Sequence, residues 1–190
     1  MSSESKPARQ IVVVDCETNG LDLTRHQPVE VAWWNLNTGE NGEFVPAFNP
    51  NTVMAEADLQ ALRVNGFLDR ITLRSFSESP TAAGEKLAAQ LRGNTLAGSN
   101  PSFDAAMLVK LPQVGPLWHH RMLDLSAYAA GVLGLDPTVL PGLASVAEFL
   151  GVPQYAPHTA WGDVQTTGEC FLELFKRAGV KLARRAEVSK

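Results

Sequence analysis

Hydrophobic residues occur along the chain in two patterns, short β-branched runs and longer segments with helical spacing. Short apolar runs bounded by polar or turn-forming residues are typical of strands. They predict five strands, which cover residues 11–14, 29–36, 43–46, 95–98 and 121–123. The first run, Ile-Val-Val-Val, ends at Asp15 and has the composition of a buried central strand. The turn-forming residues 37–42 join the second strand to the third, so these two strands are predicted to form a hairpin.

Apolar residues spaced three or four apart predict helices in the rest of the chain. These helices cover residues 81–91, 101–111, 125–133 and 143–150, and a last helix starts near Asp163. Asn100 and Pro101 are residue types that favour the N-cap and the first helical position. The last helix is predicted to bury one face, made of Val164, Thr167, Phe171, Leu174, Phe175 and Ala178, with Cys170 beside it. An initial block of strands followed by alternating strands and helices predicts an α/β fold with a mixed sheet.

Length, charge and cysteine content narrow the class of protein. The chain has 190 residues, 45% of them hydrophobic and 19% charged, which is typical of a single globular domain. Its net charge of −4 excludes a broad basic coat that binds nucleic acid by phosphate neutralisation alone. Two cysteines form no disulfide framework, and no apolar run is as long as a membrane helix. We therefore expect a cytoplasmic protein without a membrane partner, with a disordered tail over 1–9, one domain over 10–179 and a basic tail over 180–190.

Two carboxylates at the end of the first strand are the most informative residues. Asp15 and Glu17 are two positions apart, so strand geometry places both on one face and Cys16 on the other. Two acids that point the same way from a buried strand repel each other and lose hydration, and a divalent cation removes this conflict. Carboxylate oxygens suit Mg²⁺ or Mn²⁺. The alternative is that Asp15 ends the strand and Glu17 faces solvent from the following turn.

Two later segments carry further acids at predicted helix starts. Asp104 lies in the first turn of the helix that follows the fourth strand, where an acid can also simply complement the helix dipole. Asp163 starts the last helix, and His158 lies in the loop before it. A histidine close to carboxylates is a candidate proton acceptor near neutral pH.

Together these three segments resemble the motifs of the DEDDh 3′-to-5′ exonucleases, a family with a ribonuclease H-like fold. Residues 15–21, Asp-Cys-Glu-Thr-Asn-Gly-Leu, look like the family's Asp-x-Glu-Thr-x-Gly-Leu. Residues 100–104 look like its Asn-x-x-Phe-Asp, and residues 158–163 look like its third motif, whose histidine marks the subgroup. The resemblance extends from Ile11 to about Ala178. It implies a five-stranded mixed sheet with one antiparallel strand, flanked by helices.

The resemblance implies an enzyme that releases nucleoside 5′-monophosphates from the 3′ end of single-stranded DNA or RNA. Family members hold two divalent ions, Mg²⁺ or Mn²⁺, between four acids, and a histidine takes the proton from the attacking water. Carried over to this chain, the metal ligands are Asp15, Glu17, Asp104 and Asp163, and the base is His158. Asp15 would bridge both ions. Metals that hold the scissile phosphate would also reconcile the acidic net charge with a nucleic-acid substrate.

The same resemblance implies residues that contact the substrate. They are Thr18, Asn19, Gly20 and Leu21, which would form a wall at the terminal nucleotide, together with Asn100, Phe103 and Trp161. Phe103 and Trp161 could stack on bases. The alternatives are that Phe103 belongs to the core packing of its helix and that Trp161 packs against the sheet edge. Trp33 and Trp34 are adjacent on one strand, so one is core, while the other lines a groove or packs under a helix.

Other functions within this fold stay open. Residues 111–126 resemble oligoribonucleases, which are dimers that degrade very short RNAs. Those enzymes have a tyrosine, serving the partner's active site, where this chain has His120. A non-catalytic module that binds nucleic acid or a polymerase is a second alternative, although none of the four acids or the histidine is lost. A hydrolase of another phosphodiester is a third. The sequence leaves a polymerase partner and a homodimer undecided.

Overall fold

A computed structural model describes residues 8–70 and 78–182, so most of both predicted tails lies outside the described residues. Its elements, in chain order, are β1 (Ile11–Thr18), β2 (Pro28–Asn35), β3 (Asn41–Phe44), α1 (Pro50–Glu56), α2 (Leu59–Val64), α3 (Pro80–Leu91), β4 (Thr95–Gly98), α4 (Pro101–Leu108), β5 (Leu123–Asp124), α5 (Leu125–Leu133), α6 (Leu143–Leu150) and α7 (Ala160–Arg177). The strands form one sheet in the order β3-β2-β1-β4-β5. β2 is antiparallel to both of its neighbours, while β1, β4 and β5 are parallel. The predicted mixed sheet with one antiparallel strand is confirmed.

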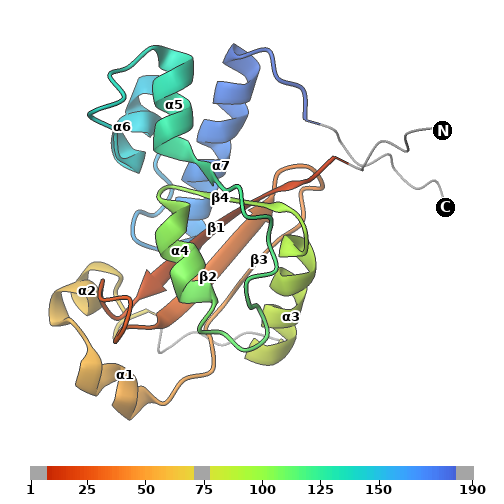
Figure 1. Ribbon diagram of the computed structural model, residues 1–190. Helices are drawn as coiled ribbons and strands as arrows, with labels where there is room; N and C mark the ends of the chain where they lie inside the picture. The colour runs from red at the N-terminus through yellow and green to blue at the C-terminus, as the bar shows by residue number, and fades with distance from the viewer. Residues whose placement is uncertain (1–7, 71–77, 183–190) are drawn as a thin grey trace, which may run out of the picture.

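Helices cover both faces of this sheet (Figure 1). Val12, Val14 and Cys16 of β1 pack on one face with residues of α3 and α4. Val13, which points the opposite way, packs with residues of α5, α6 and α7. α1 and α2 lie beside the carboxyl end of β1, where a smaller apolar cluster joins them to the start of β2. No helix in the described part of the chain is both long and apolar enough to cross a membrane.

The first strand is longer than predicted, which changes the setting of its acids. β1 continues past Asp15 to Thr18, because β2 pairs with it along this whole length. Glu17 lies opposite Glu30 of β2 within the ladder. The alternative in which Glu17 faces solvent from a turn is therefore wrong, and the prediction of both acids on one face holds.

The remaining differences lie at element ends and in short elements. α7 begins at Ala160, earlier than predicted, because the hydroxyl of Thr159 accepts from the Gly162 N–H and caps the helix. α4 ends at Leu108, before the predicted 111, and β3 begins at Asn41. Asn100 occupies the N-cap position, but its backbone is left-handed, with φ 76°, and its side chain makes no capping bond. α1 and α2 were not predicted, and the side chains of Asn49 and Asp58 cap them.

The two adjacent tryptophans pack on opposite faces of β2. Trp33 is buried in the cluster that includes α3, whereas Trp34 packs beneath α7 in the second core cluster, as the alternative of packing under a helix predicts. A methyl group added at Gly168 of α7 would lie 2.4 Å from Cε3 of Trp34. Gly168 therefore sets how closely α7 approaches the sheet.

Ala178, predicted on the buried face of this helix, is exposed because α7 has ended at Arg177.

Gly168→Ala should lower the free energy of unfolding by about 1–3 kcal/mol, because the added carbon overpacks the contact with Trp34. Urea denaturation measures this loss. Gly131→Ala in α5 is the matched control, since no atom lies within 4 Å of a Cβ there. That variant should gain up to about 1 kcal/mol from helix propensity. Equal stability of the two variants would contradict the close approach of α7.

Candidate active site

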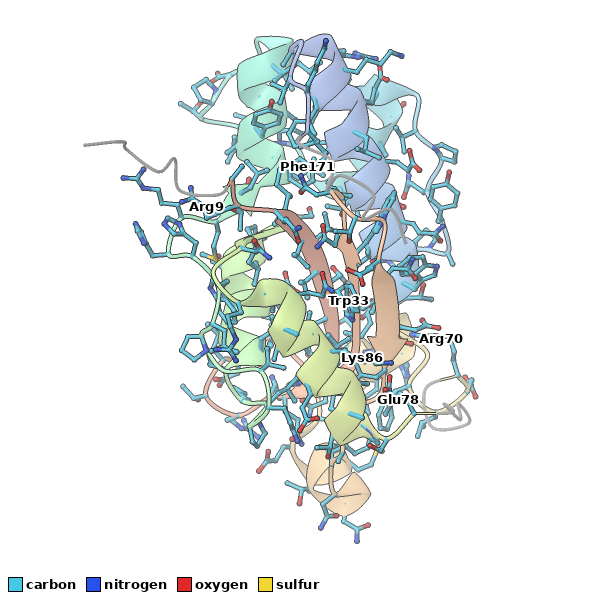
Figure 2. The ribbon with its side chains drawn as sticks, turned by 90° about the vertical axis from the view of Figure 1, so that its right-hand side faces the viewer. Arg9, Trp33, Arg70, Glu78, Lys86 and Phe171 are labelled. Atoms are coloured by element: carbon cyan, nitrogen blue, oxygen red, sulfur yellow. The ribbon has the colours of Figure 1, made fainter. Side chains whose placement is uncertain are left out.

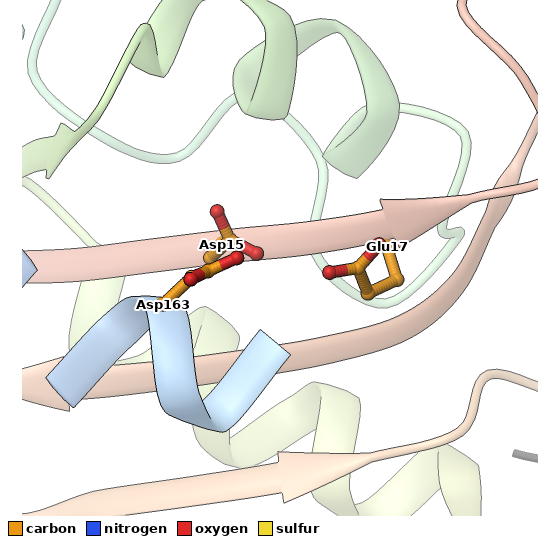
Figure 3. Close-up of side chains that lie close together, drawn as sticks. All are labelled: Asp15, Glu17 and Asp163. Atoms are coloured by element: carbon orange, nitrogen blue, oxygen red, sulfur yellow. The ribbon is translucent and has the colours of Figure 1, made fainter. Parts of the chain in front are cut away.

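Three carboxylates meet at the carboxyl end of β1 (Figure 3). Asp15 and Glu17 project from the face of β1 that α7 covers, and Asp163 comes from the first turn of α7. One oxygen of each carboxylate lies within 4.8 Å of the others. Residues separated by almost 150 positions are thus brought to one point, and all their donor atoms are hard oxygens of the kind that suit Mg²⁺ or Mn²⁺.

Asp104, the fourth predicted ligand, lies beside this cluster without being part of it. It is buried in the first turn of α4, and its Oδ1 accepts from the Cys16 N–H at 2.9 Å. The parallel pairing of β4 with β1 stops at Val13, so the Asp104 carboxylate takes the place of a strand partner for Cys16. Its charge reaches Asp15, whose pKa it helps to raise after the larger effect of burial. Asp104 therefore joins the three carboxylates electrostatically.

Burial and mutual repulsion make all four acids reluctant to ionise together. Burial, followed by the charges of Asp104 and Glu17, raises the pKa of Asp15 well above its usual range. Burial, then the charges of Asp163 and Glu30, raises the pKa of Glu17 to about 7. Burial also raises the pKa of Asp104 to about 7 and that of Asp163 above its ordinary value. A site that holds this much latent negative charge favours a bound cation.

His158 lies next to the acids in a strained loop before α7. Its backbone is left-handed, with φ 61°, a conformation that costs free energy for a residue with a Cβ. Ala156 in the same loop also has a positive φ, of 36°. The His158 N–H donates to Oδ2 of Asp163 at 3.2 Å, which ties the loop to the cluster. The exposed His158 side chain can then face whatever occupies the site.

A cavity of about 380 Å³ opens beside the acids. Its lining includes Glu17, Thr18, Leu21, Phe103 and His158 from the predicted motifs. The opposite wall is formed by α2 and its flanks, namely Asp58, Gln60, Ala61, Val64 and Asn65. This second wall could not be predicted from the sequence, because α2 has only six residues, too few to show a helical period.

The other predicted substrate residues lie around the cavity or away from it. Asn19 is buried, and its side chain bridges the Gln27 N–H and the Val53 carbonyl, which shapes the wall from behind. Gly20 packs against the imidazole of His26, where a Cβ would come within 2.2 Å of the ring. Asn100 and Trp161 are absent from the cavity lining, and Trp161 packs instead with the core beneath α7.

Glu30 is a further acid at this end of the sheet that the motifs did not indicate. It is fully buried in β2 and forms an ion pair with Arg70 at 2.5 Å between Oε1 and Nη1. A charged residue in the middle of an apolar strand is a signal that the sequence does carry, since buried charges need partners. Its partner Arg70 could not be predicted from the sequence, because the two residues are 40 positions apart.

Comparison with known proteins places this site in a family. The family model for RNase T, described as an exonuclease, matches residues 12–171. No curated protein matches the chain in sequence. A product-bound exonuclease I has a TM-score of 0.66 and 17% identity over 91% of this chain and 45% of its own. The structure of E. coli exonuclease I in complex with a dT13 oligonucleotide has a TM-score of 0.63 and 19% identity, over 89% of this chain and 41% of its own.

An ExoI/SSB-Ct complex gives a TM-score of 0.63 at 17% identity, over 91% of this chain and 42% of that one. The chain thus spans less than half the length of these proteins, and at such identities the likeness shows a shared fold, the predicted ribonuclease H-like one. The family model covers most of the chain, including every predicted ligand and His158. The chain therefore belongs to the RNase T exonuclease family, in its DEDDh group.

Proposed function

We propose that the protein is a metal-dependent exonuclease that removes nucleoside 5′-monophosphates from the 3′ end of single-stranded DNA or RNA. The observation that carries this proposal is the convergence of Asp15, Glu17 and Asp163 beside a cavity that His158 also lines. Family membership and a neighbour solved with a dT13 oligonucleotide support it. A polymerase partner and a homodimer stay predictions.

The acids fit divalent cations. Partly buried carboxylates with raised pKa values gain most from a cation, because its charge offsets both burial and repulsion. Asp15, Glu17 and Asp163 would hold Mg²⁺ or Mn²⁺, with Asp104 as the fourth acid of a two-cation site. Bound there, the cations supply Lewis-acid stabilisation of the phosphate and acidify water.

The residues around the cations divide the remaining tasks. His158, exposed at the edge of the cavity, would accept a proton from the attacking water. Leu21 lines the cavity with 76% of its surface exposed, so it could contact a terminal nucleoside. Phe103 is partly buried against the core and also lines the same cavity, so a nucleobase could stack on its ring.

The proposal predicts shortening from the 3′ end that depends on metal. DNA and RNA oligonucleotides of matched sequence and several lengths, labelled at the 5′ end, should give ladders with Mn²⁺ or Mg²⁺ and none in excess chelator. Asp15→Asn should abolish the ladder while the protein stays folded. Undiminished turnover in chelator would contradict the proposal. So would release of the 5′ label as the first product, because that would mean degradation from the 5′ end.

His158→Ala should lower kcat by roughly 10²–10⁴-fold, the usual contribution of a positioned general base. Stabilisation by Mn²⁺ should survive, because the imidazole is not among the clustered ligand atoms. Single-turnover rates and melting curves of the same preparation measure both effects. Turnover close to that of the wild type would remove His158 from the mechanism.

Metal-free protein should lose stability as pH rises from about 5 to about 7.5. Glu17 and Asp104 have folded-state pKa values of about 7, so the folded state binds protons that the unfolded state has already released. That contribution is complete below the ordinary carboxylate pKa and is lost as pH passes through about 7. Melting curves across this range test the sign, and Mn²⁺ should raise Tm more at pH 7.5 than at pH 5.

The matched control is Asp15→Asn, which should flatten the pH dependence of Tm and shrink the shift with Mn²⁺. A metal-free Tm that rises from pH 5 to pH 7.5 would show that folding does not raise the pKa values of these acids.

A further inference from the structure

A partly buried ion pair lies beside the acid cluster, on the same face of the sheet. Glu30 sits opposite Glu17 in the β1–β2 ladder, and its side chain is fully buried. Its Oε1 accepts from Arg70, and its Oε2 accepts from the backbone N–H of Ala160 at 3.0 Å. Ala160 is the first residue of α7, so this N–H has no partner within the helix. The Glu30 carboxylate therefore anchors the helix that supplies Asp163.

The guanidinium of Arg70 extends this connection to the loop of His158. Its Nη2 donates to the carbonyl of Asn65 at 2.8 Å and to that of His158 at 3.5 Å. Asn65 follows α2, and its side chain donates to the Thr18 carbonyl at the end of β1. Arg70 thus joins β2, the cavity wall and the loop before α7.

Stability alone is a weak reason for such a pair. Removing two charges from water costs about as much as their attraction returns, so buried pairs often add little to stability. This pair does what an apolar pair would not, because it binds the His158 carbonyl and the Ala160 N–H, the two backbone groups that join His158 to the start of α7. The left-handed backbone of His158 persists only where surrounding contacts hold it.

We propose that Glu30 and Arg70 are positioning residues, which hold His158 and the first turn of α7 against the acids of β1. This inference rests on the proposed function, since it assigns His158 the role of base. Neither residue touches the reacting atoms in this role. Their effect passes through the backbone at residues 158–160.

Arg70→Met should lower kcat by roughly 10²-fold, the cost of small misplacements at a catalytic group. KM should change by less than about twofold, because Arg70 is not among the residues that line the cavity. Arg70→Lys, which keeps the charge but loses the forked donors, should recover part of the rate. Lys86→Met is the matched control, because it breaks the 2.8 Å ion pair between Lys86 of α3 and Glu78, which precedes that helix (Figure 2), and should change nothing.

A double-mutant cycle separates positioning from a general loss of structure. In a His158→Ala background, Arg70→Met should cost less than about threefold, because the group it positions is gone. Losses that multiply in full would overturn the inference. So would a wild-type rate in Arg70→Met.

Amide hydrogen exchange tests the same contacts without any activity. Exchange of the Ala160 N–H should be at least about tenfold faster in Arg70→Met and in Glu30→Gln than in the wild type, while amides in the middle of α7 keep their protection. Unchanged exchange at Ala160 in Arg70→Met overturns the positioning role, even if Glu30→Gln fails to fold. A wild-type protein that cleaves no oligonucleotide would instead overturn the proposed function, and the exchange measurement would still decide whether the pair holds the loop.

Discussion

Repulsion between Asp15 and Glu17 is the constraint around which the rest of this end of the molecule is arranged. The two acids cannot turn away from each other, because the alternate residues Val14 and Cys16 are locked into the core on the opposite face of β1. A slip of one residue in the pairing with β2 would drive both carboxylates into that core. The sheet register therefore forces the charges together, and neighbouring elements must make them tolerable.

Two kinds of group supply positive potential at the acid cluster: the N-terminal ends of two helices and the side chain of Arg70. Asp104 and Asp163 each occupy the first turn of a helix, where the partial positive charge of the N-terminus favours an acid. The guanidinium of Arg70, paired with Glu30, lowers the pKa of Glu17, although the rise caused by burial is larger. The partial charges of two helix ends and the charge of Arg70 thus offset part of the repulsion among the acids.

Elements with strong local signals could be predicted from the sequence. The strand at residues 95–98 and the helices at 125–133 and 143–150 were predicted with their observed bounds. Both of these helices end at a glycine in a left-handed conformation, Gly134 and Gly151, so their limits are encoded locally. The facing of Asp15 and Glu17 also follows from local alternation, which is why the core of the site was accessible.

Features that depend on distant partners could not be predicted. β1 continues to Thr18 because β2 pairs with it, and no local signal announces that pairing. The second wall of the cavity comes from α2, whose residues Gln60 and Val64 show no periodic pattern over so short a helix. The bond between Asp104 and the Cys16 N–H spans 88 positions and depends on where β4 stops pairing.

That last bond links the order of one short helix to the occupancy of the site. α4 has eight residues and attaches its buried carboxylate directly to the backbone between the two acids of β1. If α4 opens locally, the anchor of the strand and the fourth carboxylate leave together, while the sheet stays paired on its β2 side. Cations that need all four acids would then bind only the closed form. Their apparent affinity would report the opening equilibrium of this helix, as well as the intrinsic strength of the ligand set.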